Sequence, residues 1–200
     1  MMRLYTLFIP VIVIITGCSS VTVPAVSEYT IYPHSQLNQP TEKSSSKILR
    51  LSTTKTIPSL ESKHFTYLRS SGESGNYLYT RWSDTPSQLI ERSLYHSISE
   101  KALFSAILSP TSSSNADVVL ESDLHAFYHR FDTRQPSKGV IDITYRLIDT
   151  KSKLPFASKR FLITQDAPSE DALGGVKALT EATNNLTQQC TKWIEERTKE

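Results

Sequence analysis

Two stretches in the second half of the chain alternate between apolar and polar residues, and this alternation limits the possible folds more than any other feature. A period of two is typical of a β-strand with one buried and one solvated face. Residues 141–147 show this pattern, and a predicted hairpin loop at 149–155 leads from them to a strand at 156–164. In the other stretch, 117–131, the predicted apolar face consists of Val118, Leu120, Leu124, Ala126 and Tyr128, and the predicted polar face of Asp117, Glu121, Asp123, His125 and His129. Sequential strands of this kind predict a largely antiparallel sheet whose apolar face needs a cover.

Two predicted helices supply that cover. One begins at Thr85, where Thr85 can be the N-cap, Pro86 the first helical residue and Gln88 the partner that completes a capping box. The other runs from about 169 to 196 and carries an apolar stripe with a spacing of three or four residues, formed by Val176, Leu179, Ala182, Leu186, Cys190 and Trp193. The predicted fold class is therefore α+β, with two helices packed on one face of a largely antiparallel sheet.

Shorter strands are predicted in the first half of the chain, where aromatic and β-branched residues gather. These strands cover residues 47–52, 64–69, 77–82 and 104–108. The loop at 70–76 has a length that favours a hairpin between the second and the third of them.

The first 17 residues have the features of a secretory signal peptide. Arg3 precedes an apolar run from Leu4 to Ile15, which is shorter than the roughly 20 residues of a membrane-spanning helix. The run closes on Ile15-Thr16-Gly17-Cys18, which is similar to the bacterial lipobox, in which small residues precede a cysteine that receives lipid. We therefore expect cleavage before Cys18 and acylation of Cys18. The alternative is an ordinary signal peptide with a chance cysteine just after the cut.

Cleavage at this point would leave 200 − 17 = 183 residues, which suits one domain. The net charge falls only from +2 to +1, because Arg3 is the only charged residue removed. This balance argues against nucleic acid as a partner, since proteins that bind it usually carry a concentrated basic patch. With Cys18 acylated, Cys190 is the only remaining thiol, so the fold has to rely on its core and not on disulfides.

The chain is predicted to divide into three parts: a signal peptide at 1–17, a lipidated N-terminus and tether at 18–46 with one short strand at 28–32, and an α+β domain at 47–200. The 28 residues from Ser19 to Ser46 are polar and contain three prolines. A flexible chain of that length spans typically about 25–30 Å.

The chain carries little that is typical of an enzyme, and the one Ser-x-x-Lys spacing, at 44–47, lies in a serine-rich segment where such a match carries little weight. The stretch Gly72-Glu73-Ser74-Gly75 misses the spacing of a nucleophile elbow by one position, and no glycine-rich phosphate loop or paired-cysteine metal motif occurs. Glu121, Asp123 and His125 share a predicted strand face, where residues two apart lie about 6.6 Å from one another and two of them could share a metal ion. A solvated or subunit-facing sheet surface is the favoured interpretation. We predict no catalytic residue, no metal and no cofactor.

A series of short motifs resembles one family over nearly all of the mature chain. The most specific motif is Arg81-Trp82-Ser83-Asp84-Thr85-Pro86 between a strand and a helix. In order along the chain, the motifs are the lipobox at Cys18, Glu-Tyr-Thr-Ile-Tyr at 28–32, the segment 79–86, Ala-Asp-Val-Val-Leu at 116–120, the phenylalanine-rich strand end at 127–131, Tyr-Arg-Leu-Ile-Asp at 145–149, and the tail from 178 to 194. Together they resemble the ABC-type transport auxiliary lipoproteins (PqiC-like). A longer polar segment at 33–46 departs from the family's pattern.

The resemblance implies an outer-membrane lipoprotein that is not an enzyme. Such proteins accompany an inner-membrane ABC permease and ATPase and an MCE-domain protein in lipid transport between the two membranes, which supports envelope integrity. The expected partners are membrane lipid through acylated Cys18, these transporter components, and further copies of the chain. Ser19, which follows the cysteine, is not the aspartate that typically retains lipoproteins in the inner membrane. The alternative function is a structural or assembly lipoprotein of the outer membrane without a transporter partner.

Within the most specific motif, Arg81, Trp82, Asp84 and Pro86 are the residues that the resemblance singles out for partner or family-motif contacts. For Trp82, an anchor in the core or a plug at the strand end is the favoured interpretation, and contact with a partner is the alternative.

Overall fold

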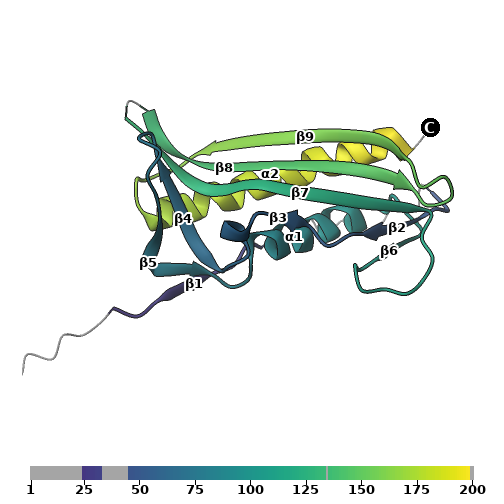
Figure 1. Ribbon diagram of the computed structural model, residues 1–200, viewed down its shortest axis with the longest axis horizontal. Coiled ribbons are helices and arrows are strands. Elements are labelled where there is room, and N and C mark those ends of the chain that lie inside the picture. The colour runs from purple at the N-terminus through teal and green to yellow at the C-terminus, as the bar shows by residue number, and fades with distance from the viewer. Residues whose placement is uncertain (1–23, 33–44, 134, 199–200) are drawn as a thin grey trace, which may run out of the picture.

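The computed structural model describes residues 24–32, 45–133 and 135–198. Within these residues the chain forms one mixed sheet and two α-helices, arranged as an elongated body (Figure 1). The strands are β1 (Ser27–Tyr29), β2 (Ile48–Leu51), β3 (Lys55–Thr56), β4 (His64–Arg69), β5 (Ser74–Trp82), β6 (Ala106–Leu108), β7 (Val118–Asp132), β8 (Gln135–Asp149) and β9 (Pro155–Asp166). The helices are α1 (Pro86–Glu100), α2 (Ala172–Thr198) and the short 3-10 helix η1 (Pro58–Leu60).

Strand β7 is paired along both of its edges. On one edge it pairs antiparallel with β8 over almost its whole length, and β8 pairs antiparallel with β9. On the other edge β2, β3 and β4 pair with β7 one after another, all in parallel. The chain from Ile48 to Arg69 thus follows β7 as one interrupted strand, with η1 in the second gap.

The predicted α+β class is confirmed, and the antiparallel character of the sheet holds only in part. The meander β7–β8–β9 and the hairpin β4–β5 are antiparallel as predicted. The other five pairings of the described sheet are parallel: β1 with β5, β2 with β6, and β2, β3 and β4 with β7. Parallel pairs need long crossover connections, here through β5, α1 and β6, and local sequence patterns do not reveal which strands such connections bring together.

The helices cover the apolar face as predicted. Helix α2 lies along β7, β8 and β9, and α1 packs beside α2 (Figure 1). All six residues of the predicted stripe on α2 are buried, and so are Ile141, Ile143, Tyr145 and Leu147 of β8. Helix α1 begins where the sequence predicts it, with Pro86 in the first turn and both hydrogen bonds of the capping box between Thr85 and Gln88.

The predicted faces of β7 are right only up to residue 125. The register shifts by one residue between Leu124, which pairs with Ile143, and Ala126, which pairs with Asp142. This β-bulge adds one residue to β7 and exchanges the two faces beyond it. Phe127 and His129 are therefore buried, at 2% and 0% exposure, and the prediction that His129 lies on the polar face with His125 is wrong.

Part of the segment predicted as a tether is packed on the domain. Strand β1 pairs in parallel with β5, and Ile31 just after it is 2% exposed in the core. Strand β1 overlaps the short strand predicted at 28–32 only at Glu28 and Tyr29. The division of the chain at residues 17 and 46 stays a prediction.

The burial of Cys190 gives a stability prediction. Its side chain is fully buried, and burial raises the pKa of its thiol far above the ordinary value. Replacement by serine puts a hydroxyl among apolar neighbours, so Cys190→Ser should lower the free energy of unfolding by about 1–3 kcal/mol in urea titrations. Cys190→Ala is the matched control, because it shortens the side chain without adding a polar group. A serine variant at least as stable as the alanine variant would contradict this expectation.

Candidate functional site at the junction of β1, β5 and α1

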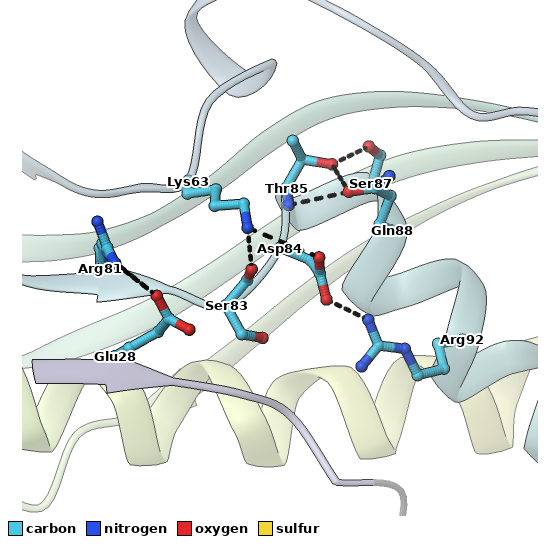
Figure 2. A network of polar contacts seen from close by, with 9 residues as sticks. All are labelled: Glu28, Lys63, Arg81, Ser83, Asp84, Thr85, Ser87, Gln88 and Arg92. Carbon is cyan, nitrogen blue, oxygen red and sulfur yellow. Dashed lines mark hydrogen bonds and ion pairs between the residues drawn. The ribbon is translucent and has the colours of Figure 1, made fainter.

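The segment from Arg81 to Pro86 joins three elements. It ends β5, turns, and starts α1, while β1 lies beside it (Figure 2). The Arg81 guanidinium makes an ion pair with Glu28 of β1 at 2.9 Å, and the backbone N–H of Ser83 donates to the carbonyl of Tyr29 at 2.7 Å. These contacts connect β1 to the end of β5 by a side-chain bond and a backbone bond.

Asp84 lies between two cations that come from different elements. The Arg92 guanidinium of α1 donates to one carboxylate oxygen, and Lys63, just before β4, lies 3.9 Å from the other. Lys63 also donates to the backbone carbonyl of Ser83 (Figure 2). Asp84 is one-third exposed, and exposed ion pairs stabilise a fold by only about 0.2–1 kcal/mol each. The network therefore serves mainly to fix the relative positions of the segments that it joins.

The motif's aromatic residue points into the core. Trp82 is 1% exposed, and its ring packs edge-on against Phe65 at 5.2 Å and Phe127 at 5.6 Å between ring centroids. Its indole N–H finds no hydrogen-bond partner among the described residues. Pro86 is buried as well, at the first turn of α1. Of the four residues singled out for contacts, Arg81 and Asp84 thus reach solvent, and their contact with a partner stays a prediction.

Open hollows lie in the surface of the described domain, and two of them border the junction or the nearby turns. A groove of about 300 Å³ runs beside Asp84 and Arg92 and is also lined by Tyr95 and Pro110. A larger hollow of about 720 Å³ lies where the β4–β5 and β7–β8 turns meet the loop before α2, and its lining includes Arg69, Phe131 and Glu170. Both are lined by mixed polar and apolar side chains, which suits contact with another surface better than enclosure of a small molecule.

The outer face of the sheet carries Asp123 and His125, which the sequence offered as possible metal ligands. Asp123 makes an ion pair with Arg146 of the neighbouring strand, and the His125 ring lies 3.0 Å from the Thr144 hydroxyl. In the ranges that the structure describes, no group of three or more His, Cys, Asp or Glu side chains is placed to hold a metal ion. A second bridge on this face, between Arg160 and Asp142, uses both carboxylate oxygens and lowers the pKa of Asp142.

His129 belongs to the buried aromatic cluster instead. One ring nitrogen lies 2.8 Å from the hydroxyl of Tyr77, and the other has no partner among the described side chains. Burial lowers the pKa of His129 to about 4, although Asp171 at the start of α2 opposes this shift. Burial likewise raises the pKa of Tyr77 to about 12. The pair is therefore neutral at physiological pH and serves packing.

Sequence reasoning missed the partners of the motif. Glu28, Lys63 and Arg92 come from three other segments, and only the strand that contains Glu28 carried a signal, as part of the family resemblance. Cys18 lies outside the described residues. No helix within the described residues is long and apolar enough to cross a membrane.

The fold and the junction together define a class: a two-helix α+β domain on a mixed sheet, with a network of ion pairs beside its N-terminal strand. Crystal structures share this fold at low sequence identity. A Xanthomonas campestris protein of the family DUF330 has a TM-score of 0.78 at 15% identity, covering 86% of this chain and 97% of that one. A hypothetical protein from Chlamydia trachomatis has a TM-score of 0.54 at 6% identity, covering 76% and 98%.

The chain belongs to the family described as the ABC-type transport auxiliary lipoprotein component, which matches residues 29–190. The match begins at Tyr29, the last residue of β1, and ends at Cys190 in α2, so it contains the junction except for Glu28. No curated protein matches the sequence.

The buried neutral His129 makes stability depend on pH. Unfolding returns the pKa of His129 from about 4 to its ordinary value near 6.5, so between these values the unfolded chain binds a proton that the folded chain does not. The free energy of unfolding should therefore have its highest value above pH 6.5 and decrease as the pH drops, by about 2 kcal/mol at pH 5. His129→Gln should flatten this slope in urea titrations between pH 5 and 7, whereas the exposed-site control His125→Gln should keep it. Equal slopes in the two variants would argue against the buried neutral histidine.

Proposed function

We propose that this protein is an outer-membrane lipoprotein, acylated at Cys18, that serves as the auxiliary component of an ABC/MCE-type lipid transport system. The observation that carries the proposal is the family match over residues 29–190, since members are auxiliary components of ABC-type transport. Ser19 after the cysteine supports sorting to the outer membrane. In this role the protein binds other proteins, transports nothing itself, and contributes to envelope integrity.

Further copies of the chain are the second proposed partner. Strand β9 is an edge strand of 12 residues that pairs only with β8 among the described strands. Its outward side chains include Phe156 and Leu162, which are 47% and 64% exposed. An open edge with exposed apolar side chains favours pairing with another chain. A ring of copies on the outer membrane would present a collar to the end of an MCE-domain protein.

The intact mass of the purified protein tests the acylation of Cys18. The native protein purified from membranes should have a mature N-terminus at Cys18 carrying acyl chains, because one myristoyl-length chain binds a bilayer only marginally and stable anchoring needs more. Cys18→Ala should block both processing and membrane retention. Cys18→Ser is the closest variant in size and should fail equally, since it lacks the thiol. A mature chain that starts elsewhere, or that carries no lipid, would remove the anchor from the proposal.

Partners are tested by crosslinking through introduced cysteines. Thr164→Cys places a thiol on exposed β9, Ser71→Cys places one on the turn after β4, and Gln188→Cys on the exposed side of α2 is the control. Cys190 is buried and should not react with the crosslinker in any of the three variants. We expect products between copies at Thr164 and products with the MCE-domain protein at Ser71 in cells that also produce the neighbouring transporter genes, and neither at Gln188.

The two candidate functions give different outcomes. If no position yields an intermolecular product and deletion of the gene leaves lipid permeability of the envelope unchanged, the transporter function is wrong. The protein would then be a structural lipoprotein without a transporter partner. Products between copies alone, with unchanged permeability, would also favour that alternative.

A further inference from the structure

Strand β1 fixes the point where the chain leaves the folded domain toward its N-terminus. It is held by its parallel pairing with β5, by the ion pair between Glu28 and Arg81, and by the burial of Ile31. Any anchor at Cys18 is therefore connected to the domain at Ser27 and not at residue 47.

The distance between anchor and domain is short as a consequence. Cys18 and Ser27 are nine Cα–Cα steps apart along the chain (27 − 18 = 9). A chain advances at most about 3.3–3.6 Å per residue, so the Cα atoms of these two residues lie no more than about 32 Å apart. The 28-residue segment from Ser19 to Ser46, used as a free tether, would permit roughly three times that reach.

Exposed apolar side chains gather on the side of the domain from which this connection comes. Leu78 is 81% exposed, Tyr79 45% and Val26 51%. Strands β1 and β5 run parallel, with Ser27 opposite Thr80, so Leu78 and Tyr79 precede the paired residues of β5 just as Val26 precedes those of β1. All three thus lie at the N-terminal end of the β1–β5 pair, the end at which the chain from Cys18 joins the domain.

Strand β5 is irregular where Leu78 and Tyr79 lie, and both side chains are exposed although they are neighbours in the strand. His64 of β4 pairs with Arg81 and Thr66 pairs with Asn76, so a single residue of β4 lies opposite four residues of β5. The extra residues bend the strand out of the regular ladder. Their apolar side chains therefore stand free of the core although they lie on a paired strand.

We propose that Val26, Leu78 and Tyr79 form a membrane-contact patch that rests on the lipid surface in which acylated Cys18 is anchored. The inference rests on the proposed acylation. Leucine contributes apolar area. Tyrosine suits the boundary of a bilayer because its ring is apolar and its hydroxyl can form hydrogen bonds with water. The neighbouring charges do not oppose this contact, because Glu28 is paired with Arg81 and Asp84 with Lys63 and Arg92. The patch holds the domain against the membrane in one orientation, with β9 pointing away from it.

The apolar residues of β9 serve as an internal comparison. Leu162 is 64% exposed, similar to Leu78, but β8, β7 and β4 lie between its strand and β5. Neighbouring strands are about 4.8 Å apart, which puts the two strands roughly 19 Å from each other across the sheet.

The test measures depth in the bilayer with a fluorescent probe. Leu78→Cys and Leu162→Cys are labelled separately with an environment-sensitive dye, since buried Cys190 does not react. The acylated protein, its lipid confirmed by mass, is reconstituted into vesicles of phosphatidylethanolamine with a minor fraction of phosphatidylglycerol, with and without spin-labelled lipid as quencher. We expect a blue-shifted emission at position 78 and lipid quenching about threefold or more stronger than at position 162.

Each other outcome identifies what has failed. Equal quenching at both positions, or none at position 78, in a protein of confirmed acylation would overturn the membrane-contact patch and leave the anchor intact. A blue shift at position 78 that persists in detergent and is not quenched by lipid would assign the patch to a second copy of the chain and also overturn the proposal. A protein without lipid at Cys18 would refute both the proposed anchoring and this inference.

Discussion

The fold depends on β7 having hydrogen-bonding partners along both edges. Strand β8 satisfies one edge, and β2, β3 and β4 share the other. A strand paired in this way can be buried, because its backbone polar groups are satisfied before α2 covers its inner face. The remaining strands attach to β7 through these neighbours: β9 through β8, β6 through β2, and β5 with β1 through β4.

The bulge in β7 decides which side chains meet at one end of the body. Beyond it Phe127 and His129 face inward and join the rings of Phe65, Tyr77 and Trp82. Without the extra residue, Ala126 and Tyr128 would face inward and the cluster between β4, β5 and β7 would not form. Helix α2 also fits this arrangement, because a Cβ atom at Gly175 would lie only 2.4 Å from the His129 ring. The glycine lets the helix approach the cluster.

The sequence predicts local structure well and long-range pairing poorly. The capping box at Thr85, the stripe on α2 and the alternation in β8 follow from neighbouring residues, and the structure confirms all three. Parallel pairing, the bulge near His125 and the partners of Asp84 depend on segments far apart in the chain. Alternation cannot show a one-residue insertion when both faces carry apolar and polar residues, as 126–129 do. At the junction, the motif's position was predictable, but the inward direction of Trp82 needed the structure to decide it.

The junction also determines how firmly the N-terminal segment is attached. A three-residue strand at an edge is weak by itself, and the exposed ion pair between Glu28 and Arg81 adds only about 0.2–1 kcal/mol. Full burial of an isoleucine side chain contributes more, about 1.5–3 kcal/mol, and Ile31 is 2% exposed. The backbone bond from Ser83 to Tyr29 then sets the register, while Ile31 supplies most of the free energy. Ile31 is thus the residue that holds the N-terminal segment at β1, and without its burial the point of attachment would move toward residue 47.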